Sequence, residues 1–276
     1  MREVVDLNSN GLCIESSGKI LRGPRWVGRY FVCKKLSDVT APIFMIYKNA
    51  TRRRNSSYKS SHSLQNYIGL ESNFELRRQS HTLAILTKEQ VLVLAFAELK
   101  NVIVWESWIR NACGQSQCYY MQLLRAPSDS KGERKSCKEV RVHLHDAHFA
   151  IVHGRPQEVI EFLPLRDLRV FSRSDVNFAF SPVPAATGDD CYSLHCARLD
   201  IFYRMLERAM RKNGLHLYLN RRIGDGEWIG EYVAQENIAP NKVASRTHSE
   251  SFNAIYNARS ADLQGVYFNK QMSKSG

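Results

Sequence analysis

The sequence predicts a mainly β protein of the α+β class, built from two domains that share one plan. Its 276 residues are about twice the usual length of a single domain. Short segments rich in β-branched and aromatic residues, divided by polar turns, fill two successive stretches, and each stretch ends in one amphipathic helix. We therefore expect two small antiparallel barrels, each closed by its C-terminal helix.

In the first stretch the strand segments are followed by a clear change of period. The expected strands are 29–33, 42–47, 81–86 and 90–96. Asn49–Ser63 lacks apolar periodicity and is expected to be a long, mobile, basic loop. Val102, Trp105, Ile109 and Ala112 then recur at spacings of 3, 4 and 3, which is the core face of one helix from Glu98 to Ala112.

The second stretch repeats this plan without repeating the residues. Its expected strands are 118–124, 140–144, 149–152, 160–162, 165–171, 177–180 and 191–195. A helix from about Leu199 to Lys212 would bury Leu199, Phe202, Leu206 and Ala209 or Met210, and Asn213-Gly214 would end it. Residues 214–276 are expected to form a partly ordered to disordered tail. Residues 215–235 retain some order, and the part from Gln235 onward is expected to be largely disordered because polar residues dominate it.

Composition excludes several classes of protein. The chain is 43% apolar and 24% charged, which is typical of folded proteins and not of disordered ones. The longest apolar stretch, Val91–Ala97, is far shorter than the roughly 20 residues of a membrane span. The N-terminus has no apolar segment typical of a signal peptide. Seven scattered cysteines without a C-x-x-C pair favour a reduced, cytoplasmic location.

The positive charge is concentrated at the N-terminus. The net charge is +12, and residues 1–60 carry 12 Lys and Arg against 4 Asp and Glu. This asymmetry predicts an anionic partner for the first domain, such as phosphoinositide headgroups, an acidic membrane leaflet or nucleic acid. Nucleic acid is the least favoured of these, because no RNA-reading motif accompanies the charge.

Catalytic motifs are absent from the sequence, so we expect a binding protein and not an enzyme. There is no phosphate-binding G-x-x-x-x-G-K-S/T loop and no G-x-S-x-G nucleophile motif. His195-Cys196 lacks the arginine six residues after the cysteine that a phosphatase loop needs, since position 202 is Phe. His143, His145, His148 and His153 form the best metal candidate, but their spacing favours ordinary strand histidines. No cofactor and no metal are expected.

Residues 11–113 resemble a pleckstrin-homology (PH) domain. The resemblance rests on Gly18-Lys19, on Trp26-Val-Gly-Arg29-Tyr-Phe-Val, and on a closing helix with Trp105-Glu-Ser-Trp-Ile109. Residues 117–213 resemble a phosphotyrosine-binding (PTB) domain of the insulin-receptor-substrate type, on Leu165-Arg-Asp-Leu168-Arg169-Val-Phe171 and Asn177-Phe-Ala-Phe180. Both resemblances imply the PH-like superfold, a seven-stranded antiparallel barrel or sandwich capped by one C-terminal helix.

A PH domain joined almost without linker to this type of PTB domain resembles the Dok (downstream-of-kinase) docking proteins. Gly69-Leu-Glu, Ser80-His-Thr-Leu-Ala-Ile85 and the Trp105 helix are most similar to the branch that serves the muscle-specific receptor kinase. The resemblance implies a non-catalytic adaptor, located in the cytoplasm and recruited to the inner face of the plasma membrane. Its implied partners are a receptor tyrosine kinase, anionic phospholipids and a second protomer.

The PTB resemblance implies where a peptide binds. In such domains an Asn-Pro-x-phosphotyrosine peptide adds as a strand against the segment Leu165–Phe171, under the last helix. Leu168, Phe171, Phe202 and Leu206 are then expected to contact the peptide. Arg169 matches the first of two phosphate-binding arginines. The second is missing, because Ser181-Pro-Val-Pro184 stands where a Gly-Arg pair is expected.

Two neighbouring arginines are candidates for the missing charge. Arg173 shares a face with Arg169 in a regular strand, whereas Arg166 faces the other way unless a bulge intervenes. Phosphotyrosine dependence and phosphate-independent peptide binding therefore remain alternatives. The second reading makes the chain a scaffold or cytoskeletal interaction protein with degenerate domains, and Pro182 and Pro184 favour it.

The PH resemblance implies a membrane site that is only partly matched. Lys19 and Arg29 fit two of the usual basic positions, but Val27 stands at a third. Arg25 and the run Arg52, Arg53 and Arg54 would add positive charge near an acidic leaflet. Tyr256 and Tyr267, in the expected tail, are the candidate phosphorylation sites for docking of other signalling proteins.

Overall fold

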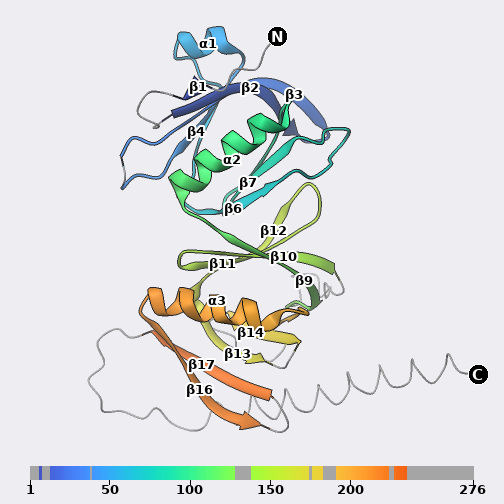
Figure 1. The fold of residues 1–276 in the computed structure, drawn as a ribbon, viewed down its shortest axis with the longest axis vertical. Coiled ribbons are helices and arrows are strands. Elements are labelled where there is room, and N and C mark those ends of the chain that lie inside the picture. The colour runs from blue at the N-terminus through green and yellow to red at the C-terminus, as the bar shows by residue number, and fades with distance from the viewer. Residues whose placement is uncertain are drawn as a thin grey trace, which may run out of the picture.

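The computed structural model describes the chain in two stacked units of strands and helices (Figure 1). It describes residues 6–7, 13–37, 39–127, 138–173, 176–182, 191–223 and 227–234. Every strand pairing within these residues is antiparallel. The predicted mainly β fold with two PH-like domains is confirmed, with additional strands in both sheets.

The first domain is a curled sheet closed by one helix. Its strands are β1 (Asp6–Leu7), β2 (Cys13–Arg22), β3 (Arg25–Lys34), β4 (Ile43–Tyr47), β5 (Ser60–Ser63), β6 (Tyr67–Ser72), β7 (Thr82–Thr87) and β8 (Val91–Ala95). Seven of them follow the order β5-β4-β3-β2-β8-β7-β6, and β1 pairs with β2 outside this path. Helix α2 (Leu99–Cys113) closes the sheet.

Trp105 anchors α2 to the first core. Its side chain is fully buried among the rings of Phe31, Phe44 and Phe96, with centroid distances of 5.9 to 6.4 Å. The indole Nε1 donates a hydrogen bond of 2.9 Å to Ser16 Oγ, so its only polar atom is satisfied inside the core. The period of apolar residues in this helix therefore predicted its buried face correctly.

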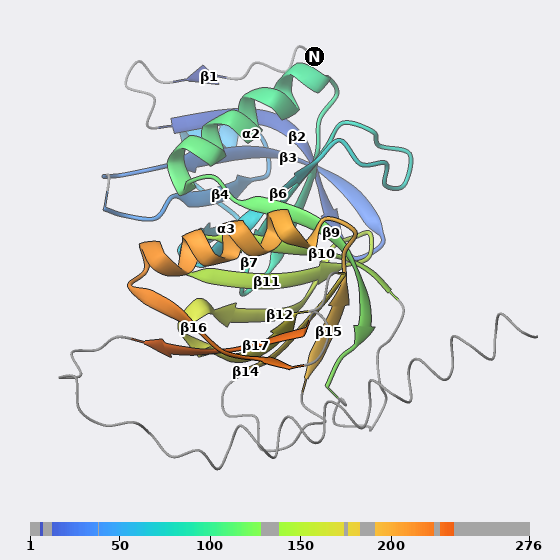
Figure 2. The same ribbon diagram turned by 60° about the horizontal axis from the view of Figure 1, so that its bottom comes forward.

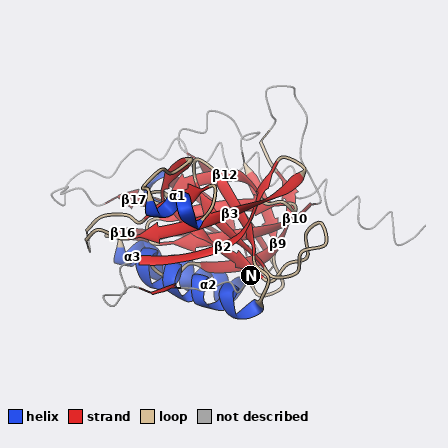
Figure 3. Ribbon diagram, turned by 90° about the horizontal axis from the view of Figure 1, so that it is seen from above, coloured by secondary structure: helices blue, strands red, loops and turns tan. Residues whose placement is uncertain are grey.

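The second domain has the same plan with a longer sheet. Its strands are β9 (Gln117–Arg125), β10 (Lys138–His145), β11 (His148–His153), β12 (Glu158–Pro164), β13 (Leu168–Arg173), β14 (Asn177–Pro182), β15 (Tyr192–His195), β16 (Leu215–Ile223) and β17 (Glu227–Ala234). The sheet order is β12-β11-β10-β9-β15-β14-β13-β17-β16. Helix α3 (Leu199–Lys212) packs Leu199, Phe202, Leu206 and Met210 into its core. Both closing helices lie on the same side of the molecule (Figure 3).

Two local expectations from the sequence are wrong. The expected loop Asn49–Ser63 contains helix α1 (Ala50–Arg54) and strand β5, because Asn49 Oδ1 caps the helix by accepting the N–H of Arg52 at 3.0 Å. The segment expected to be a continuous strand from Leu165 begins with the 3₁₀ turn η1 (Leu165–Asp167). The N–H of Leu165 donates to Ala147 O at 2.7 Å, and its buried side chain fixes the turn.

Candidate peptide-binding edge, basic surface and domain junction

Strand β13 is the segment at which the PTB resemblance places the peptide. It is paired on both sides, with β14 on one edge and β17 on the other. The pairing with β17 runs from Val170 opposite Glu231 to Arg173 opposite Trp228. The edge that was expected to receive an external peptide is therefore occupied by a strand of the same chain.

Four residues were expected to contact the peptide, and three of them lie in the core. Leu168, Phe202 and Leu206 are fully buried in the apolar cluster of the second domain. The ring of Phe202 packs against Tyr119 and Phe178 at centroid distances of 5.1 and 5.2 Å. These three side chains are part of the core, and they do not line an accessible groove. Phe171 lies in β13 opposite Phe180 and Gly230 in the strand register.

The three candidate phosphate-binding arginines lie on η1 and β13. Arg166 is on η1, its side chain is 75% exposed, and its Nε is 3.9 Å from Asp167 Oδ1. Arg169 and Arg173 are both in β13. The register with β14 shifts between Leu168 and Val170, so the irregularity falls at Arg169. In a regular strand, residues four apart lie on the same face. Because of this irregularity, that rule does not place Arg169 and Arg173 on one face. Residues 183–190, which include Pro184, lie outside the described residues.

The basic residues predicted for the first domain do not form one site. Lys19 pairs with Gly28, whereas Arg29 pairs with Gly18, so Lys19 and Arg29 belong to opposite faces of the β2–β3 hairpin. Arg53 donates from Nε to Glu15 Oε2 at 2.8 Å, an ion pair that neutralises it. The hydrogen bond from Arg53 to Glu15 is also the main reason that the pKa of the guanidinium is raised. Arg52 and Arg54, beside it on α1, are exposed.

A different basic surface is assembled at the β2–β3 turn. Arg22 and Arg25 are opposite one another across Gly23-Pro24. The loop between β6 and β7 reaches this turn, because Arg77 donates to Gly23 O at 3.3 Å and Lys19 Nζ donates to Gln79 Oε1 at 3.3 Å. Sequence reasoning missed the contribution of this loop, since Arg77-Arg78 is 52 residues or more from Arg25 in the chain and only the fold joins them.

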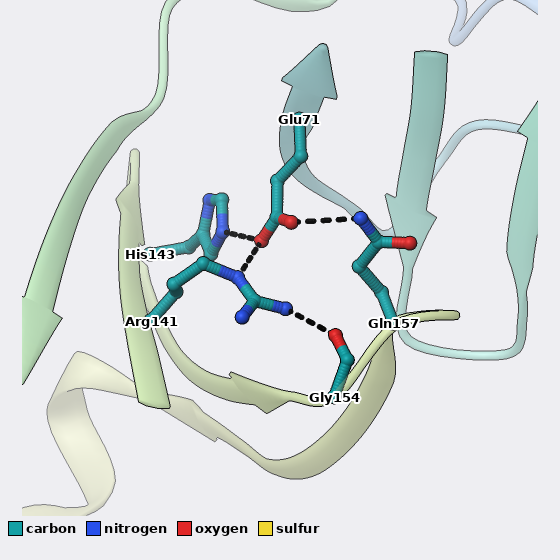
Figure 4. Close-up of polar contacts among 5 residues, drawn as sticks. All are labelled: Glu71, Arg141, His143, Gly154 and Gln157. Carbon is teal, nitrogen blue, oxygen red and sulfur yellow. Dashed lines mark hydrogen bonds and ion pairs between the residues drawn. The ribbon is translucent and has the colours of Figure 1, made fainter. Parts of the chain in front are cut away.

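A buried polar cluster joins the two domains (Figure 4). Glu71, at the end of β6 in the first domain, accepts hydrogen bonds from the second domain at both carboxylate oxygens. Arg141 Nε donates at 2.6 Å and His143 Nε2 lies at 3.1 Å from Oε1, and Gln157 Nε2 donates to Oε2 at 2.9 Å. A further nitrogen of Arg141 donates to Gly154 O at 2.9 Å. The cluster therefore fixes β6 against β10 and the β11–β12 turn.

The electrostatics of this cluster favour an ionised carboxylate. Burial alone would raise the pKa of Glu71, but hydrogen bonds from His143, Arg141 and Gln157, together with the charge of Arg141, lower it to about 2. The side chains of Glu71 and Arg141 are only 11% and 9% exposed. The pair is thus a buried, hydrogen-bonded link between domains.

An apolar contact surrounds the polar cluster. Ile68, Ala84 and Leu86 on the outer face of the first sheet form one buried group with Ala150 and Val152 of β11. Two cations also reach across to rings of the other domain. Lys88 Nζ is 5.4 Å from the ring centre of Phe162, and the Arg155 guanidinium is 5.7 Å from that of Phe74.

Gly69 allows β6 to approach β10 this closely. A Cβ atom at Gly69 would lie 2.6 Å from His143 Nδ1 and 2.7 Å from Ser116 Oγ. His145, next along β10 on the same face, has its Nε2 3.0 Å from Cys113 O and its ring 4.9 Å from that of Tyr67. Two of the four histidines considered as metal candidates, His143 and His145, therefore contribute to the domain junction.

The same junction contains the one group of side chains, among the described residues, with ligand types and spacing suited to a metal ion. The ligand atoms of Glu71, Cys118 and His143 lie within 4.8 Å of one another. However, Arg141 already donates to the Glu71 oxygen that His143 contacts. Desolvation of the thiol, followed by the charge of Glu71, raises the pKa of Cys118 to about 12 although the residue as a whole is exposed, and this disfavours the thiolate that a metal would need. The arrangement fits an ion pair better than a cation.

Two further features bear on membrane recruitment and docking. Among the described residues, no helix combines the length and the apolar character that crossing a membrane requires. Tyr256 and Tyr267, the candidate phosphorylation sites, lie outside the described residues.

The fold and the site together define a class of protein, a fused pair of PH-like domains of which the second presents an arginine-bearing strand. No family model matches the chain. The chain is 27% identical to the mouse and human proteins Dok-7 over 169 residues, which are 60% of this chain and 32% of those proteins. It is 21% identical to Dok-7 of Takifugu rubripes over 174 residues, which are 62% of this chain and 34% of that protein. The matches thus span about a third of the length of these relatives.

The similarity to Dok-7 confirms the resemblance to the Dok docking proteins, and within them to the muscle-kinase branch. It supports a docking adaptor as the general class of function.

Proposed function

We propose that this chain is a non-catalytic signalling adaptor that binds a juxtamembrane peptide of a receptor tyrosine kinase through its second domain. The single observation that carries the proposal is β13, an arginine-bearing strand that accepts an antiparallel partner on the side away from β14. Main-chain pairing at such an edge supplies affinity for any extended peptide, and side chains supply selectivity. The similarity to Dok-7 supports the same choice.

In this proposal Arg169 holds the phosphate of an Asn-Pro-x-phosphotyrosine turn. A guanidinium presents two N–H groups to two phosphate oxygens, and one charge-assisted hydrogen bond contributes roughly 1.5–3 kcal/mol. Arg166, which is exposed one turn before β13, is the nearest described candidate for a second contact. Arg173 is the alternative within the strand.

The first domain recruits the chain to an anionic membrane at the inner face of the plasma membrane, through the basic surface at the β2–β3 turn. Arg22, Arg25 and Arg77 gather there, and each basic residue near an acidic leaflet contributes about 1 kcal/mol. The junction through Glu71 and Arg141 would then hold the second domain at a fixed angle to the membrane. A second protomer is the other partner that the first domain would engage.

The peptide proposal is tested by fluorescence anisotropy with a labelled Asn-Pro-x-phosphotyrosine peptide and the full chain. Arg169→Ala is expected to weaken binding by tenfold or more, because about 1.5 kcal/mol or more is lost. Arg204→Ala is the matched control, since Arg204 is an exposed arginine on α3 whose ion pair with Asp200 is at the surface. Equal binding by a folded Arg169→Ala chain and the parent would contradict the assigned role.

The membrane proposal is tested by sedimentation with vesicles containing phosphatidylserine. We expect the triple variant Arg22→Ala, Arg25→Ala, Arg77→Ala to lose most of the vesicle-bound fraction, and Arg204→Ala to keep it. Unchanged sedimentation of the triple variant would contradict recruitment through this surface.

The second candidate function is a scaffold or cytoskeletal interaction protein that binds unmodified peptides. It is favoured by Pro182, which ends β14 close to where the second phosphate-binding arginine is expected. Both candidate functions place the peptide at the edge of β13. They differ only in whether binding depends on phosphorylation of the peptide.

A further inference from the structure

We propose that the segment Glu227–Ala234 is an intramolecular ligand of β13, which occupies the peptide edge and must leave before an external peptide binds. The proposal rests on the proposed function only for the identity of that external peptide. The pairing itself is a feature of this chain.

The position of β17 is that of a bound strand. It runs antiparallel to β13 with a continuous register from Val170–Glu231 through Phe171–Gly230 and Ser172–Ile229 to Arg173–Trp228. On its far side β17 pairs with β16, and β16 lies beside α3. Figure 2 shows this hairpin below α3. Main-chain groups of β13 that would pair with a peptide are thus already paired.

The hairpin is an addition to a domain that is complete without it. Strands β9 to β15 and helix α3 repeat the plan of the first domain, in which seven strands and α2 close the barrel. The hairpin follows α3 directly, because the helix ends at Lys212 and β16 begins at Leu215. So short a connection keeps the hairpin beside the edge of β13 at high effective concentration.

An external peptide would compete with β17 for one position. Both would pair with the main-chain groups of β13 from Val170 to Arg173, which β17 already occupies. The two ligands therefore cannot be bound to this edge at the same time.

Only chains in which the edge of β13 is open can bind a peptide. The apparent affinity is therefore the intrinsic affinity multiplied by the fraction of chains in which this edge is open. Opening the hairpin is then expected to tighten binding without any new contact. Ile229→Pro removes a backbone N–H from a strand that is paired on both edges, so it removes a ladder hydrogen bond and disfavours the hairpin. Ile229→Val keeps the N–H and the β-branched side chain, and it is the matched control.

The test that does not depend on any receptor uses a labelled synthetic peptide of residues 226–235 and the full chain. We expect the Ile229→Pro chain to bind this peptide at least tenfold more tightly than either the parent or Ile229→Val. Equal binding by all three chains, or no binding by a folded Ile229→Pro chain, would overturn the inference. Far-ultraviolet circular dichroism reports whether the variant is folded.

A covalent lock tests the same inference without opening the hairpin. Opposed pairs alternate between two geometries along an antiparallel ladder, so we use two double variants, Ser172→Cys/Ile229→Cys and Phe171→Cys/Gly230→Cys, each with Cys118→Ser. At least one is expected to form the disulfide, to lose peptide binding when oxidised and to regain it when reduced. Retained binding by the oxidised chain, or failure of both pairs to form the disulfide, would overturn the inference.

The same chains separate this inference from the proposed function. If the Ile229→Pro chain binds the 226–235 peptide but no Asn-Pro-x-phosphotyrosine peptide, the inference stands and the proposed function fails. If every chain binds the phosphopeptide equally well, the lock included, the proposed function stands and the inference fails.

Discussion

Replacing Glu71 by glutamine is the most informative perturbation of the domain junction. Glu71→Gln keeps the size of the side chain but removes its charge, so Arg141, which is only 9% exposed, loses its counter-ion. The carboxylate accepts hydrogen bonds at both of its oxygens, from Arg141, His143 and Gln157. The amide of glutamine has only one oxygen, and its NH2 group would face one of these donors. At least one buried donor is left without an acceptor.

Two estimates of the cost agree. Removing one member of a buried ion pair costs about 3–5 kcal/mol. Independently, the pKa of Glu71 falls from 4.5 to about 2 in the folded chain, and at about 1.36 kcal/mol per unit this corresponds to about 3 kcal/mol. We therefore expect Glu71→Gln to lower the free energy of unfolding by about 3 kcal/mol at pH 7.

The assay is equilibrium unfolding in urea, followed by tryptophan fluorescence. With a slope of about 2–3 kcal/mol per molar, the midpoint is expected to fall by about 1 M. Glu98→Gln is the matched control, because the Glu98 side chain is 51% exposed and a surface pair with Lys100 contributes little. The double variant Glu71→Met/Arg141→Met is expected to recover much of the loss, since it leaves no unpaired charge. A Glu71→Gln midpoint within error of the parent would refute the reasoning.

Four other outcomes follow from the described contacts. Because the pKa of Glu71 is lower in the folded chain, its contribution to the free energy of unfolding is complete above pH 4.5 and is lost as the pH falls toward 2. Acid unfolding followed by circular dichroism should therefore be less steep in Glu71→Gln than in the parent. Gly69→Ala should lower the unfolding free energy by about 1–3 kcal/mol in urea titrations, because the added carbon meets the buried ring of His143 at 2.6 Å. Ser16→Ala should lower it by about 1–3 kcal/mol, since Trp105 Nε1 loses its buried acceptor. Phe202→Ala should lower the unfolding free energy by about 3–5 kcal/mol and shift the thermal midpoint down by several degrees, because removing a fully buried ring leaves a cavity. A change within about 0.5 kcal/mol for Gly69→Ala, Ser16→Ala or Phe202→Ala would contradict the reason given for that variant.

The fold was largely predictable because its two helices have strong apolar periods. Trp105 and Phe202 were placed on buried faces from spacing alone, and both are fully buried. The helix α1 was missed because its five residues have no apolar face, and it depends on the Asn49 cap and on the ion pair of Arg53 with Glu15. Such short helices are set by local hydrogen bonds that periodicity does not detect.

The domain junction had a signal in the sequence that was not used. Strand β7, Thr82–Thr87, is buried along its whole length, so its two faces pack against different cores. Leu83 and Ile85 belong to the first core, whereas Ala84 and Leu86 face the second domain. An uninterrupted apolar strand is typical of burial on both faces, and it indicates that something covers the outer face of the sheet. The identity of the cover, and its ion pair with Glu71, required the three-dimensional arrangement.

The peptide edge was predictable only in part. The sequence located β13 and its arginines, but it did not predict the irregularity at Arg169 or the pairing with β17. Both depend on contacts between segments about 60 residues apart or on the exact register of neighbouring strands. The basic surface at the β2–β3 turn was incomplete for the same reason, since Arg77 reaches it from another loop.

The central claim, that the second domain is a phosphotyrosine-dependent docking site, is tested most directly by one comparison of peptides. The parent chain and Ile229→Pro are each titrated with an Asn-Pro-x-Tyr peptide in phosphorylated and unphosphorylated form, with fluorescence anisotropy as the readout. We expect the phosphopeptide to bind at least tenfold more tightly than the unphosphorylated peptide, which corresponds to about 1.4 kcal/mol. Equal binding of the two peptides, or binding of neither by the opened chain, would contradict it.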